Sequence, residues 1–119
     1  MLQNFSDMDW QPHPILTGVA TRFAALALPG HPVVDTLVAQ VAPGGILLRH
    51  SHPETCEIAY VLSASGQMRE GEPGDELVRA LTEGCALFIP AGVPHQIENT
   101  SAEVMFIFAV HTRKVESNA

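Results

Sequence analysis

The chain has 119 residues, of which 46% are hydrophobic and 16% are charged, and its formal net charge is −7. This length predicts one domain with a core of its own, and the apolar share excludes a disordered chain. Six basic residues against thirteen acidic ones exclude a protein that coats a polyanion, so we expect no nucleic-acid partner. The charged share is low for a soluble protein, so it must be explained how the chain forms a solvated surface with so few charged residues.

The first ten residues do not have the pattern of a signal peptide. They contain Asp7 and Asp9 where a signal peptide has a basic stretch and then a long apolar one. No run approaches the roughly 18 apolar residues of a membrane-spanning helix. Cys56 and Cys85 are too few for a disulfide framework and fit reduced thiols. We expect a cytoplasmic protein without a membrane partner.

Gly and Pro recur along the chain and separate short runs rich in β-forming residues. Residues 17–28 could be argued as a helix, but their Val, Thr and Phe content and the Pro29-Gly30 that follows favour a strand. The later runs are 33–41, 46–49, 57–62, 76–81, 86–89, 95–99 and 104–111. Short strands at regular intervals with turns between them predict an all-β sandwich or barrel.

Two segments bear on the surface. Residues 69–76 are acidic and rich in turn formers, which predicts a solvated hairpin loop in preference to a cation site. Residues 104–110 are apolar on both faces of the expected strand, so both faces need a cover. The barrel interior covers one face, and the other face then needs a partner subunit or another layer. We therefore expect a homodimer, the commonest assembly.

The clearest chemical signal is His50-Ser51-His52 followed by Glu57. Two His at positions i and i+2 of a strand point to the same face. Residues 53–55 form a turn in this interpretation, so Glu57 opens the next strand and can return to the same side. Two imidazoles and a carboxylate that converge on one point indicate a metal site, and without a cation the buried carboxylate would lack compensation. Further along, His95 begins a strand after a tight turn.

Two ordered sets of residues resemble the two conserved motifs of the cupins. The first set is Gly44, His50, His52, Glu57 and a turn glycine at Gly66, and the second is Gly84, Pro90, Gly92, His95 and Asn99. Together they span close to half of the chain. The glycine that usually ends the first motif is Ala64 here, which suggests a slightly longer hairpin. Cys85 stands where the family often has Asp.

The resemblance implies an all-β fold, the double-stranded β-helix or jelly-roll β-barrel, with six to eight strands and a metal at its centre. It implies residues 1–32 as an N-terminal arm with the first strand or strands, and residues 33–112 as the barrel core of a single domain. The implied ligands are His50, His52, Glu57 and His95, which would hold one divalent ion, either Fe, Mn, Ni or Zn. In octahedral geometry this set leaves two open positions, as a catalytic site requires.

Alternation along the strands predicts the lining of this site. The inward positions are Leu48 beside His50, Ala59 and Val61 after Glu57, and Ile97 and Asn99 after His95, whereas Arg49, Tyr60 and Gln96 point away. The lining is mostly apolar and contains no side chain that we can name as a general base. Catalytic residues therefore stay unassigned, and a metal-bound water or the substrate itself would carry the protons.

Rival sites are weaker. A closed zinc site from both cysteines and two histidines is disfavoured because Cys56 is adjacent to Glu57 and faces the other way. A cysteine nucleophile would need a nearby base, and small apolar filling fits better. The remaining histidines, His13, His31 and His111, are expected at the surface.

Three functions remain. The first is a metal-dependent enzyme acting on a small organic molecule, of dioxygenase, isomerase, lyase or hydrolase type. The second is a non-catalytic binding or sensor protein for a small molecule. The third, a barrel without metal, is least favoured because all four implied ligands are present. Fold class alone cannot decide between the first two.

Overall fold

A computed structural model describes residues 4–7, 9–12, 19–25 and 30–114. These residues form one short 3₁₀ helix and ten strands. The elements are η1 (Phe5–Asp7), β1 (Gln11–Pro12), β2 (Val19–Ala25), β3 (Val33–Val41), β4 (Ile46–His50), β5 (Thr55–Val61), β6 (Gly66–Glu70), β7 (Leu77–Leu81), β8 (Ala86–Ile89), β9 (His95–Asn99) and β10 (Met105–Arg113). No helix among them is long and apolar enough to cross a membrane.

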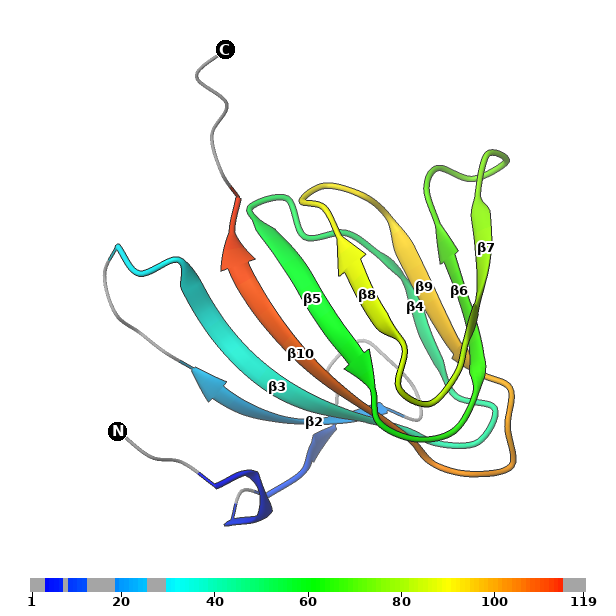
Figure 1. Cartoon of the computed structure of the whole chain (residues 1–119), viewed down its shortest axis with the longest axis horizontal. Coiled ribbons are helices and arrows are strands. Elements are labelled where there is room, and N and C mark those ends of the chain that lie inside the picture. The colour runs from blue at the N-terminus through cyan, green and yellow to red at the C-terminus, as the bar shows by residue number, and fades with distance from the viewer. Residues whose placement is uncertain (1–3, 8, 13–18, 26–29, 115–119) are drawn as a thin grey trace.

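The strands form two antiparallel sheets. The larger sheet has the order β1-β2-β3-β10-β5-β8 and the smaller one β4-β9-β6-β7. Figure 1 shows the two sheets as facing layers, with β2 and β3 extending to one side of the smaller sheet. This arrangement confirms the predicted all-β jelly-roll fold. The strand number exceeds the expected six to eight because β1 and β2 add to one edge of the larger sheet, beyond β3.

The core lies between the sheets and follows the two-residue period of the strands. In β10, buried residues alternate with half-buried ones from Met105 to Thr112. The fully buried apolar side chains include Val41, Val61, Met68, Leu81, Ile89 and Met105. Because alternate residues point to opposite faces, this pattern fixes which side chains of each strand reach the interior.

The outer face of β10 is partly covered within the chain. This strand lies between β3 and β5, and its outward residues, Phe106 and Phe108 among them, are half-buried. The Trp10 ring contributes to this cover, since its centroid lies 6.1 Å from that of Phe106. The N-terminal segment therefore supplies some of the cover that the sequence led us to expect from a partner subunit.

The turn glycine expected at the end of the first motif is not at Gly66, and Ala64 takes the turn conformation instead. Gly66 is not a turn glycine, because it opens strand β6, which the sequence runs did not include. A Cβ at this position would collide with the backbone carbonyl of Glu98 in β9, so a close approach of strands requires glycine here. Ala64 takes the turn conformation, with φ of 72°, a region that L-residues other than Asn and Asp seldom adopt.

The acidic hairpin between β6 and β7 is held to its neighbours. The Arg49 guanidinium of β4 forms an ion pair with Glu76 and donates a hydrogen bond of 2.9 Å to the Gly71 carbonyl. Arg79 pairs with Glu70 across the hairpin at 3.1 Å. The predicted hairpin is present, but these two carboxylates are paired rather than simply solvated. Within the described ranges, no group able to hold a metal lies here.

Candidate metal centre

His50, the last residue of strand β4, faces the interior because the pairing register of this strand shifts. His50 pairs with His95 of β9, and the pairing register shifts between Leu47 and His50. The shift breaks the simple alternation, so Leu47 and His50 both line the pocket between the sheets. The prediction that Leu48 points inward is therefore wrong, since that side chain is 52% exposed. A bulge of this kind cannot be read from alternation alone.

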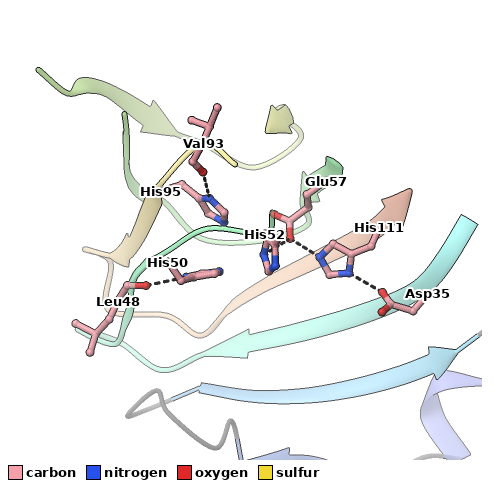
Figure 2. Close-up of polar contacts among 8 residues, drawn as sticks. All are labelled: Asp35, Leu48, His50, His52, Glu57, Val93, His95 and His111. Atoms are coloured by element: carbon pink, nitrogen blue, oxygen red, sulfur yellow. Dashed lines mark hydrogen bonds and ion pairs between the residues drawn. The ribbon is translucent and has the colours of Figure 1, made fainter. Parts of the chain in front are cut away.

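Three imidazoles converge in the pocket, as Figure 2 shows. One ring nitrogen from each of His50, His52 and His95 lies within 4.8 Å of the others. The Nδ1 atoms of His50 and His95 donate hydrogen bonds to the carbonyls of Leu48 and Val93, at 2.7 and 3.0 Å. These bonds fix the tautomer and orient the rings, which leaves each Nε2 with a lone pair, the state in which imidazole binds metals.

Burial disfavours the charged forms of two of these histidines, His52 and His95. Loss of hydration, reinforced by the charges of neighbouring histidines and opposed by Glu57, lowers the pKa of His52 to about 4. Burial likewise lowers the pKa of His95, against the hydrogen bond to the Val93 carbonyl. Among the described residues, the buried Nε2 atoms of His52 and His95 find no hydrogen-bond partner. Such atoms cost stability unless a ligand uses them.

A row of three ionisable side chains runs beside the imidazoles. His111 of β10 is the cross-strand partner of Asp35 in β3 and of Glu57 in β5. Its Nδ1 lies 2.5 Å from Asp35 Oδ1 and its Nε2 lies 2.7 Å from Glu57 Oε1. The prediction of a surface position for His111 is wrong, because the residue is buried and faces the pocket. We call Asp35, His111 and Glu57 the carboxylate–histidine row (Figure 2).

The row carries the charges of the site. Two carboxylate acceptors on its two ring nitrogens require a doubly protonated His111. Burial disfavours that imidazolium, but the hydrogen bonds and charges of Glu57 and Asp35 outweigh burial and raise the pKa of His111 to about 9. For Glu57, burial acts to raise the pKa, yet the hydrogen bond and charge of His111 win and lower it. The row thus combines one cation with two anions.

The pocket between the sheets has a volume of about 110 Å³. The inward positions predicted on β5 and β9 are confirmed: Ala59, Val61, Ile97 and Asn99 are buried, while Tyr60 is exposed. The pocket is lined by Leu37, Ala39, Leu47, His50, His52, Glu57, His95, Ile97, Ile107, Ala109 and His111. Its polar groups are thus four imidazoles and one carboxylate in an otherwise apolar wall.

The structure brings the four implied ligands to one pocket but divides them. His50, His52 and His95 form one group, whereas Glu57 forms a second with His52 and His111. Glu57 Oε1 and His52 Nε2 are 3.9 Å apart. The assignment of all four as ligands of one ion therefore stays a prediction. The sequence interpretation missed His111 and Asp35, although counting in twos along 105–111 places His111 on the inward face.

The cysteines and the remaining histidines lie apart from the cluster. Neither Cys56 nor Cys85 belongs to a metal-competent group, and both are free thiols. His31 is half-buried and accepts a hydrogen bond from the Val33 amide through its Nδ1. His13 lies outside the described residues.

Comparison with known proteins identifies the family. The family model described as a cupin domain matches residues 37–111, so the chain belongs to the cupins. The match contains the three-histidine group and the carboxylate–histidine row except Asp35. No curated protein sequence matches the chain.

Solved structures with the same fold include several cupins. A variant of oxalate decarboxylase from Bacillus subtilis superimposes with a TM-score of 0.75 at 24% identity, over 98% of this chain and 31% of that one. A predicted oxalate decarboxylase from Thermotoga maritima gives 0.74 at 21% identity, over 95% and 99%. KdgF from a Halomonas species gives 0.69 at 19%, over 92% of each chain. The chain thus spans under a third of the Bacillus protein.

Proposed function

We propose that this protein is a metal-dependent cupin whose His50, His52 and His95 hold one divalent ion, with Glu57 as the fourth ligand. Fe, Mn, Ni and Zn are the candidate ions, because imidazole suits all of them and a carboxylate favours the harder ones. A structure of the Bacillus oxalate decarboxylase is described with Mn(II) centres, which lends support to manganese among these candidates.

The observation that carries the proposal is the pair of buried Nε2 atoms without partners. Each of the three imidazoles offers one ring nitrogen within 4.8 Å of the others, and His50 and His95 hold their Nδ1 atoms on backbone carbonyls. An ordinary core would leave no such atoms unsatisfied. A divalent cation would satisfy them, and its charge would meet the negative charge that Glu57 brings to the same pocket.

We further propose that the ion serves an enzyme acting on a small organic molecule, of dioxygenase, isomerase or lyase type. A bound ion would act as a Lewis acid at its open positions. The chain itself orients the imidazoles, surrounds them with an otherwise apolar wall, and limits ligand size. An apolar cavity of about 150 Å³ holds benzene, so a pocket of about 110 Å³ suits a ligand of a few non-hydrogen atoms.

Metal analysis tests the metal site. Wild-type protein, prepared with added Mn²⁺ and freed of excess, should carry about one ion per chain. His50→Ala should carry far less, because one of three convergent nitrogens is gone. As a matched control, His31→Ala removes a half-buried histidine whose ring accepts a hydrogen bond from the Val33 amide and which belongs to neither metal-competent group of the described residues, and it should keep the wild-type content. Full occupancy in His50→Ala would contradict the assignment.

The alternative function is a binding or sensor protein without turnover. One observation favours it: among the described pocket residues, the only carboxylate is Glu57, and it is already hydrogen-bonded to His111. Once the three imidazoles hold an ion, the described pocket residues therefore offer no free side-chain base. A substrate panel on metal-loaded protein under air and under nitrogen separates the functions. Turnover only under air supports a dioxygenase, turnover in both supports an isomerase or lyase, and saturable binding without turnover supports the alternative.

We also propose that the protein is a homodimer through the outer face of the larger sheet. Ile58 and Tyr60 of β5 and Phe88 of β8 are 38%, 46% and 59% exposed, and Ile58 pairs directly with Phe88. An interface formed by these adjacent apolar side chains would explain why so few residues of the chain are charged, because a second copy would bury them. Sedimentation velocity at micromolar concentration should give a dimer, and Phe88→Lys a monomer.

The control variant lies on the other sheet. Leu77 of β7 is as exposed as Phe88, at 59%, so Leu77→Lys adds the same charge at an equally exposed apolar position and should stay dimeric. A monomeric wild-type protein would contradict the proposed dimer.

A further inference from the structure

We infer that Asp35 and His111 are positioning residues that hold the Glu57 carboxylate toward the three-histidine group. This inference rests on the proposed metal site. It concerns two side chains outside the four implied ligands, one of which lies before the segment that matches the cupin family model.

The backbone of the larger sheet creates the row. Strand β10 lies between β3 and β5, and its register places His111 opposite Asp35 on one side and Glu57 on the other. Side chains that are direct cross-strand neighbours have Cβ atoms about 5 Å apart, close enough for polar contact. The three groups therefore meet because of strand pairing, without help from a mobile loop.

The hydrogen bond between His111 and Glu57 depends on the one between His111 and Asp35. His111 donates from Nε2 to Glu57 Oε1 at 2.7 Å and from Nδ1 to Asp35 Oδ1 at 2.5 Å. The second bond fixes the ring that makes the first. Among the described residues Asp35 has a hydrogen bond to His111 and none to Glu57, so we expect Asp35 to act on Glu57 through His111.

The row leaves Glu57 partly free for a metal. Only Oε1 of Glu57 bonds to His111 within the described chain, and this same oxygen lies 3.9 Å from His52 Nε2. A carboxylate has about four acceptor sites on two oxygens, so it can accept from His111 and still bind a cation. Hydrogen bonds from outside a metal's ligand set orient the ligands, and their loss costs about 10–100-fold in affinity.

Hydrogen bonds, and not distance, set the two roles apart. In Figure 2, His111 lies beside Glu57 with Asp35 on its other side. The His111 ring is close to the three-histidine group, since its centroid is 5.1 Å from that of His52, against 5.4 Å between His52 and His95. Both nitrogens of His111 are engaged by carboxylates, whereas two of the other three imidazoles have a free buried Nε2. His111 therefore supports a ligand and is not one itself.

The test is a set of Co²⁺ titrations followed by visible absorption, with full-length protein freed of metal beforehand. His111→Leu should weaken Co²⁺ binding by about 10–100-fold. His111→Gln should lose less, because its amide can still donate to Glu57. Asp35→Asn should weaken binding in the wild-type background and have no effect in the His111→Leu background. A merely structural role would not distinguish leucine from glutamine by their hydrogen-bonding capacity.

Met105→Ala is the control for destabilisation of the same strand. Met105 is fully buried in β10 and does not line the pocket, so this variant should lower the melting temperature and keep the Co²⁺ affinity. Thermal unfolding of each metal-free variant shows which ones are folded at the titration temperature.

The outcomes separate this inference from the proposed function. Wild-type protein that binds no Co²⁺ overturns both. Wild-type binding with an affinity within about twofold in His111→Leu overturns the inference alone. Equal loss in His111→Leu, His111→Gln and His50→Ala also overturns it, because His111 would then be a ligand. Additive effects of Asp35→Asn and His111→Leu would show that Asp35 acts on the ion by its charge and not through His111.

Discussion

The pocket contains two groups of histidines that differ in how their polar atoms are satisfied. In the carboxylate–histidine row, His111 has a carboxylate on each ring nitrogen. In the three-histidine group, the Nε2 atoms of His52 and His95 are buried without a partner among the described residues. The first group is complete within the protein, whereas in the proposed function a cation completes the second. In that proposal the same residue type supports the structure at one position and binds a metal at others.

Burial acts on both histidines, and only the neighbours of His111 outweigh it. His95 and His111 are both buried, at 2% and 8% exposure. Burial lowers the pKa of His95, and the hydrogen bond to the Val93 carbonyl does not offset this effect. The neighbours of His111 are Glu57 and Asp35, and its pKa is raised to about 9. Opposite charges on adjacent strands therefore decide which histidine is charged and which is free to bind a metal.

The largest expected difference between the two histidine groups is the loss of metal affinity in His52→Leu. This variant should lose more than about 100-fold in Co²⁺ affinity, since one of three convergent nitrogens is removed. The metal-free protein should change in stability by less than about 1 kcal/mol, because the replaced nitrogen has no partner to lose. Calorimetric titration and urea unfolding measure the two quantities. A large loss of metal-free stability would place His52 with the satisfied group.

The complementary variant, His111→Leu, should show its effect without any metal. Removal of the imidazolium leaves Glu57 and Asp35 as partly buried carboxylates without a partner. Breaking a fully buried pair costs 3–5 kcal/mol, and because both carboxylates retain some exposure we expect about 2–3 kcal/mol. Urea unfolding of the metal-free protein measures the loss. Stability equal to that of the wild-type protein would contradict the structural role of the row.

Metal removal should then affect the two variants differently. At an ion concentration of about 100 times Kd, binding adds roughly 2.7 kcal/mol to the wild-type protein, and a chelator removes it. We expect a fall of several degrees in the melting temperature for wild type, a smaller fall for His111→Leu, and none for His52→Leu. A chelator effect in His52→Leu equal to that in wild type would show that the ion binds elsewhere.

The pH dependence of metal-free stability should have opposite slopes for the two groups. His52 has a folded pKa of about 4 against 6.5 unfolded, so the unfolded chain binds more protons between these values and stability falls with decreasing pH. His111 has a folded pKa of about 9, so its contribution is complete below about pH 6.5 and is lost as the pH rises through 9.

Stability of the metal-free protein should therefore be highest near pH 6.5. His52→Leu should flatten the acidic side of the profile and His111→Leu the alkaline side, as followed by thermal unfolding across pH 4–10. A wild-type profile that rises from pH 6.5 to pH 9 would contradict the charge state of His111.

The sequence predicted the fold and the position of the cluster because both depend on local patterns. The spacing of His50, His52 and Glu57 indicates convergence, and the turn residues and β-rich runs indicate a sandwich or barrel. The resemblance to the cupin motifs added His95 and the jelly-roll fold. The error at Leu48 arose because a register shift in β4 breaks alternation, and the residues alone do not reveal a shift. His111 was misplaced for another reason. It ends an apolar run, and its partners Asp35 and Glu57 are 76 and 54 residues away.

The crystal structure of metal-loaded protein, with the ion located by its anomalous scattering, tests the central claim most directly. The two metal-competent groups share His52 but predict different positions for the ion. Our account predicts a single peak bonded to the Nε2 atoms of His50, His52 and His95, with the His111–Glu57 hydrogen bond intact. A peak bonded to His111 and distant from His50 and His95 would contradict it.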